Sequence, residues 1–514
     1  MRYRSTVVPS GVLRRGMAPC LAVLVVIGAL TVFGCGGDGG GSSRFTAATA
    51  TDLTNRTFTF TAGAGPNLAT VLGLPAGQAF SLQIGNFGGT TTAPVQLDAG
   101  GNTASGTVTI GSCIFRFDRS TFPAGSGPQA SAQFTIDTCE VDRDNRTLRL
   151  ATPGGESTVS STANLLPTTN VAFVLTTDFS SGSYAVVDLA SRNVFRDIRR
   201  GGVDSDATPA RFFNGRVYVV NRGANSIQII DPQQGFTTPT NGELSTGSGT
   251  NPQDIAFVSA TKAYVSRLAS ARLLIINPTT LARLGELDLS GLVKAADGDR
   301  SPEPAHMLVH RGLVYVALQH LDFSRPVSGI PSKVARGEVA VIDPTNDTIR
   351  AVLQLNGQNP VSEFQFSATL NRILISAVGD FAVRDGGIEA INPDTNTVDS
   401  RLALSEEAVG GDITAFVIVS RTKGFAVVSD ANFANSLVTF DPSTGQRLNR
   451  IVGPLNVFVP HLAINSRNEV YLAVADTRTP TPGLRIFDTV TDRELTTTPL
   501  RVGQLPPQFT LFIE

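Results

Sequence analysis

Seven polar residues recur at equivalent places along the chain, each at the start of an apolar segment and usually just after a proline. They are Arg211, Asp254, His306, Glu363, Asp412, His461 and Gln508. Six of them are ionisable, so a fold that brought them together would form a site for a small ligand or a cation, with the two histidines as ligands or acid–base groups. The alternative is a wet channel lined by solvated polar side chains, because clusters of ionisable residues are often structural.

A second set consists of aspartates that end apolar segments: Asp178, Asp380, Asp430 and Asp476. Carboxylate oxygens are ligands that Ca²⁺ prefers, which makes this set a hypothesis for a metal site. The alternative is that each aspartate caps its own turn, the commoner role of an isolated Asp at the end of a strand.

Known catalytic and cofactor motifs are missing from the sequence. It has no His-Glu-x-x-His, no Gly-x-x-x-x-Gly-Lys loop, no Gly-x-Ser-x-Gly elbow after a strand and no Cys/His metal array. No cofactor is therefore indicated. The candidates for catalysis reduce to His306 or His461 as a base, with Glu363 or Asp254 as an acid.

The elements that must position these residues belong to a repeated unit. Its third strand recurs as "YAVVDL", "IQIIDP", "LLIINP", "VAVIDP", "IEAINP", "LVTFDP" and "LRIFDT", at spacings of 43, 46, 66, 49, 49 and 47 residues. The Asp or Asn that ends this strand is expected to cap the following turn. One complete unit reads as four strands, A "PQDIAFVS", B "KAYVSR", C "ARLLIINP" and D "RLGELDLS". A period of about 40 to 50 residues with four strands per unit is typical of a β-propeller blade, and seven copies predict seven blades.

The two ends of the repeated region complement each other. The first unit opens at strand B with "NVAFVLTTD", and the chain finishes with "LPPQFTLFIE", which has the pattern of a strand A that no B follows. We expect this last strand to complete the first blade, so that residues 164–514 form a closed ring without an exposed sheet edge.

The stretch "VYVVNRGANSIQIIDP" resembles the YVTN-type β-propeller repeat of bacterial surface and exported proteins, and the match extends in weaker form over residues 164–514. The resemblance implies a seven-bladed propeller. It does not imply one activity, because related propellers serve as binding platforms and, in more distant relatives, as lactonases or quinone-cofactor dehydrogenases.

Residues 44–163 carry short bursts of alternating apolar and polar residues, such as "RTFTFTAG" and "SGTVTIGSCIFRF". This pattern predicts a small antiparallel β-sandwich or barrel. Cys113 and Cys139 fall in this region, and in an exported chain a disulfide between them is expected.

The N-terminus has the layout of a secretory signal over residues 1–34, with four arginines and an apolar core from Leu21 to Phe33. Val32-Phe33-Gly34-Cys35 resembles the lipobox of bacterial lipoproteins, which implies lipidation of Cys35. Residues 35–43 are rich in Gly and Ser and predict a flexible tether. With Gly36 after the cysteine, the resemblance favours the outer membrane, on the periplasmic or the cell-surface side.

Charge argues against nucleic-acid binding. Removal of residues 1–34 leaves 37 of the 41 basic residues against 43 acidic ones, a net charge of −6, and no basic run remains.

Antiparallel strands place the B-to-C and D-to-A loops on one face of a propeller. These are the long loops, Ser290–Pro304, Gln319–Gly337, Val378–Gly387 and Ala475–Gly483, and they predict a binding face unless they are merely tolerated insertions. The sequence therefore favours a lipid-anchored, non-enzymatic envelope protein that binds a protein or another envelope component. The alternative is a lactonase-like hydrolase, or a propeller that binds a small ligand or a metal ion in its central channel.

Overall fold

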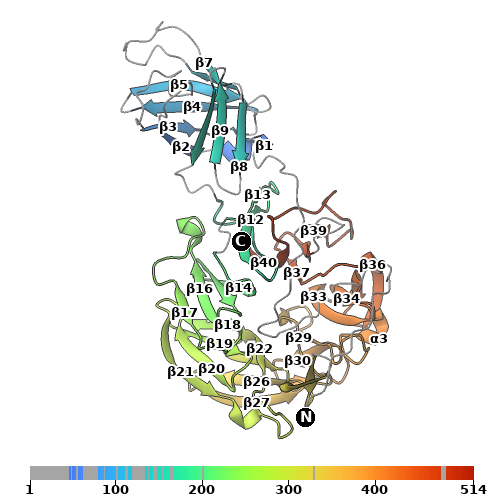
Figure 1. The fold of residues 1–514 in the computed structure, drawn as a ribbon. Coiled ribbons are helices and arrows are strands. Elements are labelled where there is room, and N and C mark those ends of the chain that lie inside the picture. Colours follow the sequence, from blue (N-terminus) through green and yellow to red (C-terminus); the bar gives the residue numbers. More distant parts are fainter. Residues whose placement is uncertain are drawn as a thin grey trace, which may run out of the picture. The chain divides into compact units, whose positions relative to one another are not determined.

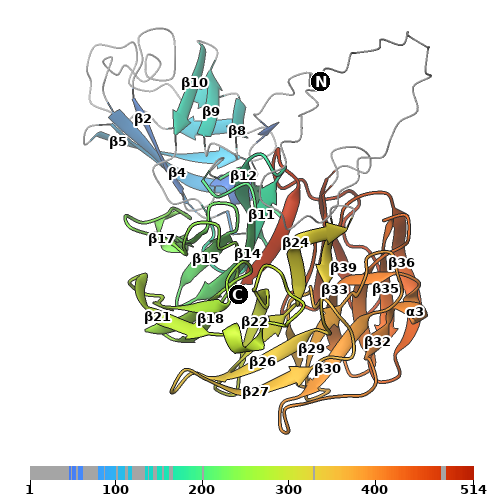
Figure 2. The same cartoon turned by 60° about the horizontal axis from the view of Figure 1, so that its bottom comes forward.

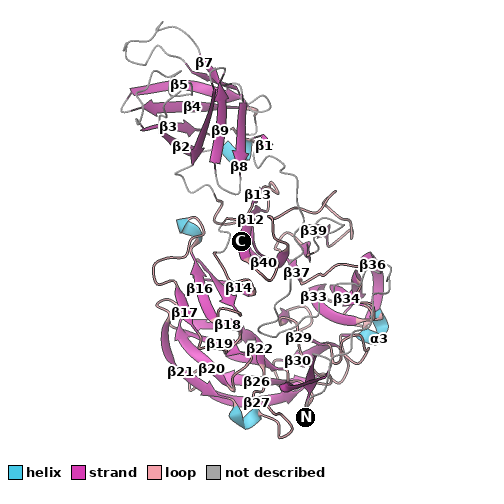
Figure 3. Cartoon of the chain, in the orientation of Figure 1, coloured by secondary structure: helices cyan, strands magenta, loops and turns pink. Residues whose placement is uncertain are grey.

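The computed structural model describes residues 46–47, 49–53, 56–61, 79–85, 87–88, 90–99, 102–109, 114–117, 134–136, 138–142, 147–152, 155–160, 166–198, 202–327, 330–475 and 482–514. Strands dominate these residues (Figure 3), which confirms the predicted all-β fold class. None of the helices within them has the length and apolar character of a membrane-spanning segment. The predicted signal, the tether and Cys35 lie outside the described residues.

The N-terminal strands form two antiparallel sheets, one in the order β2-β3-β4-β5-β6-β7 and one in the order β1-β8-β9-β10. Leu82 and Ile84 on one strand, and Ala93 and Val95 on the next, are buried while the residues between them are exposed, as a period of two requires. The elements are β1 (Thr46–Ala47), α1 (Ala50–Leu53), β2 (Arg56–Thr61), β3 (Ala79–Ile84), β4 (Thr92–Ala99), β5 (Asn102–Thr109), β6 (Ile114–Phe117), β7 (Phe134–Ile136), β8 (Thr138–Asp142), β9 (Thr147–Thr152) and β10 (Gly155–Ser160).

The disulfide expected in this region stays a prediction. Cys113 lies outside the described residues, and Cys139 is described only as a residue of β8.

The described residues from 166 onward form seven antiparallel sheets, called sheets 1 to 7 here, and one separate hairpin (Figure 1). Sheet 1 contains β40 (Pro507–Ile513), β11 (Val171–Thr177), β12 (Gly182–Asp188) and β13 (Val194–Phe195). Sheet 2 contains β14 (Ala207–Phe213), β15 (Arg216–Asn221), β16 (Ser226–Ile230) and β17 (Glu243–Ser245), and sheet 3 contains β18 (Pro252–Ser259), β19 (Lys262–Arg267), β20 (Arg272–Asn277) and β21 (Ala282–Asp288). Sheet 4 contains β22 (Pro304–His310), β23 (Leu313–Leu318), β26 (Glu338–Asp343) and β27 (Thr348–Gln354).

Sheet 5 contains β28 (Gln365–Ser367), β29 (Arg372–Ala377), β30 (Gly387–Asn392), β31 (Thr397–Val398) and β32 (Leu404–Ser405). Sheet 6 contains β33 (Asp412–Ser420), β34 (Lys423–Ser429), β35 (Asn435–Asp441) and β36 (Gln446–Leu455), and sheet 7 contains β37 (His461–Ile464), β38 (Glu469–Val474) and β39 (Gly483–Asp488). The separate hairpin is β24 (Leu321–Val327) with β25 (Ile330–Lys333), inserted between the B and C strands of sheet 4. The short helices are η2 (Pro232–Gln234), η3 (Ser290–Leu292) and α3 (Glu406–Val409).

The last strand of the chain completes the first sheet. β40 pairs antiparallel with β11 from Val171 opposite Ile513 to Leu175 opposite Phe509, and Figure 2 shows this red strand beside green β11. The A strands also contact one another from sheet to sheet, β40 with β14, β14 with β18, β18 with β22, β28 with β33, and β33 with β37, which contacts β40. The A strands therefore surround the centre of a β-propeller.

Asp or Asn at the end of each C strand caps the turn that follows, as the repeat predicts. In sheet 3, the Asn277 side-chain oxygen accepts from the Thr279 N–H at 3.0 Å. In sheet 6, Asp441 Oδ1 accepts from the Ser443 N–H at 2.8 Å. These local bonds fix the C-to-D turns independently of the rest of the fold.

A repeated tyrosine on strand B joins neighbouring sheets. These tyrosines are buried, and each hydroxyl reaches the C-to-D turn of the next sheet. Tyr218 donates to Pro278 O at 3.0 Å, Tyr315 donates to Asn396 Oδ1 at 2.8 Å, Tyr264 donates to Asp347, and Tyr471 accepts from Arg192 of sheet 1. Their side chains thus fill the space between sheets, and their hydroxyls join four of the seven sheets to the next one.

Replacing Tyr315 by Phe tests this contact between sheets. We expect the free energy of unfolding to fall by about 1 kcal/mol, the usual net contribution of such a hydrogen bond. Urea unfolding of Tyr315→Phe, Asn396→Ala and the double variant gives the coupling between the two side chains. If the stability losses of the two single variants simply added in the double variant, the two side chains would not interact and the contact between sheets would be contradicted.

Candidate functional site

Five of the seven polar residues predicted to converge meet in one connected group, the central cluster. Its members come from sheets 2, 3, 4, 5 and 7 in turn: Arg211, Asp254, His306, Glu363 and His461. Four of them lie on A strands, and Glu363 precedes β28. The antiparallel order places these strand starts at the same end of the sheets as the B-to-C and D-to-A loops.

Arg211 is the hub of the central cluster. Its Nε donates to Asp254 Oδ1 at 2.9 Å and its Nη2 to Asp254 Oδ2 at 2.8 Å, a bidentate pair. Its Nη1 forms an ion pair with Glu363 of sheet 5, and its guanidinium carbon lies 5.8 Å from the Phe509 ring centre. Burial alone would lower the pKa of Arg211, but the carboxylates of Asp254 and Glu363 raise it above its usual value. One cation therefore binds acids from two sheets that are not neighbours.

Asp254 is fully buried and its oxygens are fully used. Besides Arg211, it accepts from the Ile255 N–H at 2.8 Å and the Met307 N–H at 3.0 Å. Burial alone would raise the pKa of Asp254, but Arg211 and His306 hold it below its usual value. A buried carboxylate with four donors is suited to anchoring its neighbours and not to contacting a ligand.

His461 has both ring nitrogens engaged. Its Nδ1 accepts from the Thr510 N–H at 3.2 Å, so the ring proton is on Nε2, which donates to Glu363 Oε2 at 2.8 Å. Burial opposes ionisation of Glu363, yet Arg211 and His461 hold the pKa of this carboxyl well below its usual value. His461 can therefore act as a base or a metal ligand only if it gives up one of these bonds.

His306 has fewer contacts within the central cluster than His461 has. Its Nδ1 lies 3.5 Å from Asp254 Oδ2, and its side chain is 19% exposed. The side chains of Arg211 and Glu363 are 22% and 31% exposed. These three side chains keep the most solvent exposure in the central cluster.

Asp412 and Gln508 lie apart from the hydrogen bonds of the central cluster. Asp412 accepts from the Ala382 N–H at 2.8 Å, and burial together with the nearby Asp385 raises its pKa to about 6. Gln508 is buried at the start of β40. Asp412 follows a glycine pair, whereas most of the other members of the set follow a proline, so the chain before its strand differs from the chain before theirs.

Three of the four aspartates proposed for calcium are described, and they do not meet. Asp178 Oδ1 accepts from the Ser180 and Ser181 N–H groups, and Asp430 Oδ1 accepts from the Asn432 and Ala434 N–H groups. Asp380 forms an ion pair with Lys333 at 2.8 Å. Asp476 lies outside the described residues. Asp178 and Asp430 thus cap their own turns, and none of the three described aspartates belongs to a group with metal-ligand spacing.

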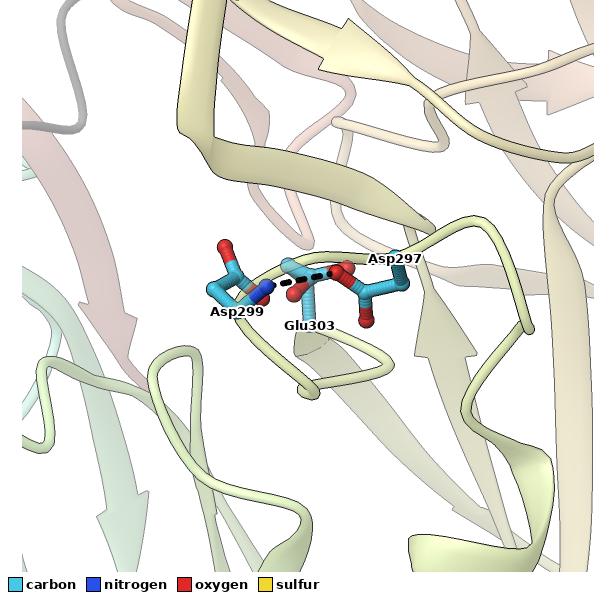
Figure 4. A group of neighbouring side chains, drawn as sticks. All are labelled: Asp297, Asp299 and Glu303. Atoms are coloured by element: carbon cyan, nitrogen blue, oxygen red, sulfur yellow. Dashed lines mark hydrogen bonds between the residues drawn. The ribbon is translucent and has the colours of Figure 1, made fainter.

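A group of acids that the sequence did not single out lies in the loop between β21 and β22. Asp297, Asp299 and Glu303 converge there (Figure 4), with their nearest ligand atoms all within 4.8 Å of one another. The available signal was the Asp-x-Asp-x-x-x-Glu pattern in the long loop Ser290–Pro304.

No protein-family model and no curated protein matches the chain. Among solved structures, it is similar to the dihydro-heme d1 dehydrogenase NirN in complex with DHE, with 13% identity over 68% of this chain and 76% of that one and a TM-score of 0.46. It is also similar to the β-propeller domain of Cps50 (Swd1) from Myceliophteria thermophila, with 10% identity, 62% and 98% coverage and a TM-score of 0.43. Apo AztD from Citrobacter koseri matches with 10% identity, 66% and 97% coverage and a TM-score of 0.40. Similarity this low leaves the function to be argued from the residues of the chain itself.

Proposed function

We propose that the protein is an exported, lipid-anchored envelope protein of the YVTN propeller type, and that its loop face binds a protein or another envelope component. The loop face is the end of the propeller that carries the B-to-C and D-to-A loops. Exposed apolar side chains on the B-to-C loops are the observation that carries this proposal.

These side chains, called the apolar rim here, belong to four different sheets: Phe179, Val327, Ile330, Val383 and Phe433. They are between 40% and 69% exposed, and the antiparallel topology directs all of their loops to one face. Phe179 and Phe433 have φ angles of 63° and 59°, which an aromatic residue adopts only at a cost. Large apolar side chains held in water on one face are typical of a binding surface.

The largest insertion on this face is firmly attached to the propeller. The hairpin β24–β25 is bound through Lys333, whose Nζ lies 2.8 Å from Asp380, and through the Leu321 N–H, which donates to Glu303 at 2.7 Å. The Phe323 N–H donates to Asp299, also at 2.7 Å. A hairpin fixed in this way presents Val327 and Ile330 without a large entropic cost on binding.

The central cluster supports a structural role more than a catalytic one. Arg211, Asp254, Glu363 and His461 satisfy one another across the channel, so that their polar atoms are already committed. The lactonase-like alternative would need His306 to act as a base while the neighbouring acids remain in these ion pairs. A binding platform needs only the rigid ring that this network provides.

Substitutions at the apolar rim test the proposal. We expect the variant Val327→Ser/Ile330→Ser/Phe433→Ser to lose at least about 2 kcal/mol of binding free energy, as truncation of apolar anchors does. Retention of native envelope components by the immobilised protein, measured by quantitative mass spectrometry, reports the loss. The stability should change by less than about 0.5 kcal/mol, because these side chains are exposed.

A matched control variant is Leu284→Ser/Val352→Ser, which removes exposed apolar side chains from the D strands of sheets 3 and 4. Equal losses in both variants, or full retention in the rim variant, would contradict binding by the loop face. Detection of acylated Cys35 at the mature N-terminus tests the lipid anchor separately.

A further inference from the structure

The acidic group in the loop between β21 and β22 has an incomplete set of partners. Glu303 is fully buried, and its Oε2 accepts from the Leu321 N–H at 2.7 Å. Its Oε1 is also buried but has no hydrogen-bond partner among the described residues. Figure 4 shows this carboxyl group between Asp297 and Asp299. A buried oxygen without a donor, facing two further carboxylates, indicates a missing ligand.

The charge of this group is not neutralised by the protein. Among the described ion pairs, none joins a Lys or Arg to Asp297, Asp299 or Glu303. A bound cation would balance the charge that these carboxylates bring together.

We propose that Asp297, Asp299 and Glu303 bind a calcium ion that fastens the loop before sheet 4 to the hairpin β24–β25. The ligand set is all oxygen, which selects a hard cation. Ca²⁺ accepts several protein oxygens in a flexible geometry, whereas Mg²⁺ usually keeps several waters and is rarely held by protein groups alone. The three residues offer ligand atoms within 4.8 Å of one another, close enough to reach one ion.

The ion would act on both segments at once. Asp299 Oδ2 already accepts from the Phe323 N–H at 2.7 Å, and Glu303 accepts from the Leu321 N–H, so two of the three ligands are bonded to β24. Asp297 accepts from the Asp299 N–H at 3.2 Å and closes the loop on itself. This site does not depend on the proposed binding function, since it is defined by the acids alone.

Isothermal titration of the full mature protein with CaCl₂, after removal of metals with EDTA, tests the site. We expect one calcium ion per chain in the wild type, and a calcium-dependent rise of the melting temperature. Loss of a residue that only hydrogen-bonds a metal ligand weakens metal binding by roughly 10- to 100-fold. Asp297→Asn and Glu303→Gln remove a ligand itself, so each should weaken calcium binding by more than this. Asp430→Asn, a turn cap in sheet 6, serves as the matched control and should bind calcium as the wild type does.

Three other results would overturn the proposal. Absence of a heat of calcium binding in the wild type would rule the site out, and undiminished calcium binding by Asp297→Asn would place the ion elsewhere. Equal affinity for MgCl₂ would contradict the assignment to calcium. If Glu303→Gln fails to fold, as judged by circular dichroism, Asp297→Asn decides alone, because Asp297 is bonded within its own loop.

Discussion

Arg211→Ala is expected to lower the free energy of unfolding by about 3 to 5 kcal/mol at pH 7, the usual effect of removing one partner from a buried ion pair. Asp254 has no solvent exposure and would lose the guanidinium that compensates its buried charge. Glu363 would lose its ion pair as well, and with it the link between sheets 2 and 5. Urea unfolding at pH 7 measures the loss.

The effect of this substitution should depend on pH in a defined direction. Both Asp254 and Glu363 have pKa values lowered by folding, from ordinary values of 3.8 and 4.5. Their contribution to stability is therefore fully present above about pH 5 and is lost as the pH falls through the lowered pKa values. The difference between wild type and Arg211→Ala should shrink when unfolding is measured at pH 3.

Arg311→Ala is the matched control, because Arg311 and Asp394 form an ion pair in which both side chains are about half exposed. Its cost should stay below about 1 kcal/mol. If Arg211→Ala cost no more than this control, or lost the same stability at pH 3 as at pH 7, the central cluster would not be what holds the inner strands together.

Removal of residues 507–514 should abolish cooperative unfolding and cause aggregation. β11 would lose its partner from Val171 to Thr176 and expose a free edge. Phe509 and Ile513 would leave the core, at about 1.5 to 3 kcal/mol each. The Thr510 N–H bond to His461 would be lost as well. Together these losses are comparable with the total stability of a domain, about 5 to 15 kcal/mol.

Thermal unfolding followed by light scattering measures this effect, and deletion of Glu514 alone is the control. Glu514 is exposed and accepts from Ser466, so the control should unfold nearly as the wild type does. A synthetic peptide with the sequence of residues 505–514, added in excess, should restore part of the transition by pairing with β11. A cooperative transition in the truncated protein without the peptide would contradict the role of β40.

The repeat explains why so much of the fold was predictable. Strand bounds in sheet 3 follow the alternation and turn residues of "PQDIAFVS" and its successors almost residue for residue, because each strand is short and punctuated by its own turn chemistry. The repeat did not reveal that the hydroxyls of Tyr218 and its equivalents bond the next sheet, since a contact between sheets has no local signature.

The candidate site was predictable only in part. Their position after a proline identified Arg211, Asp254 and His461 as members of one set. Spacing along the chain does not predict that Arg211 reaches Glu363 across the channel. Asp297 and Glu303 were missed because their significance depends on burial and on β24, which comes later in the chain. The apolar rim was missed for a related reason, since Phe433 reads as an ordinary apolar residue until its exposure is known.

Site-specific photo-cross-linking in intact cells tests the proposed binding face most directly. A photoreactive residue at Phe179, Val383 or Phe433 samples the loop face, whereas one at Val490, exposed in the C-to-D turn of sheet 7, samples the opposite face. We predict that the three loop-face positions yield the same cross-linked partner and that Val490 yields none. The same adduct from Val490, or no adduct from any loop-face position, would contradict a binding platform on this face.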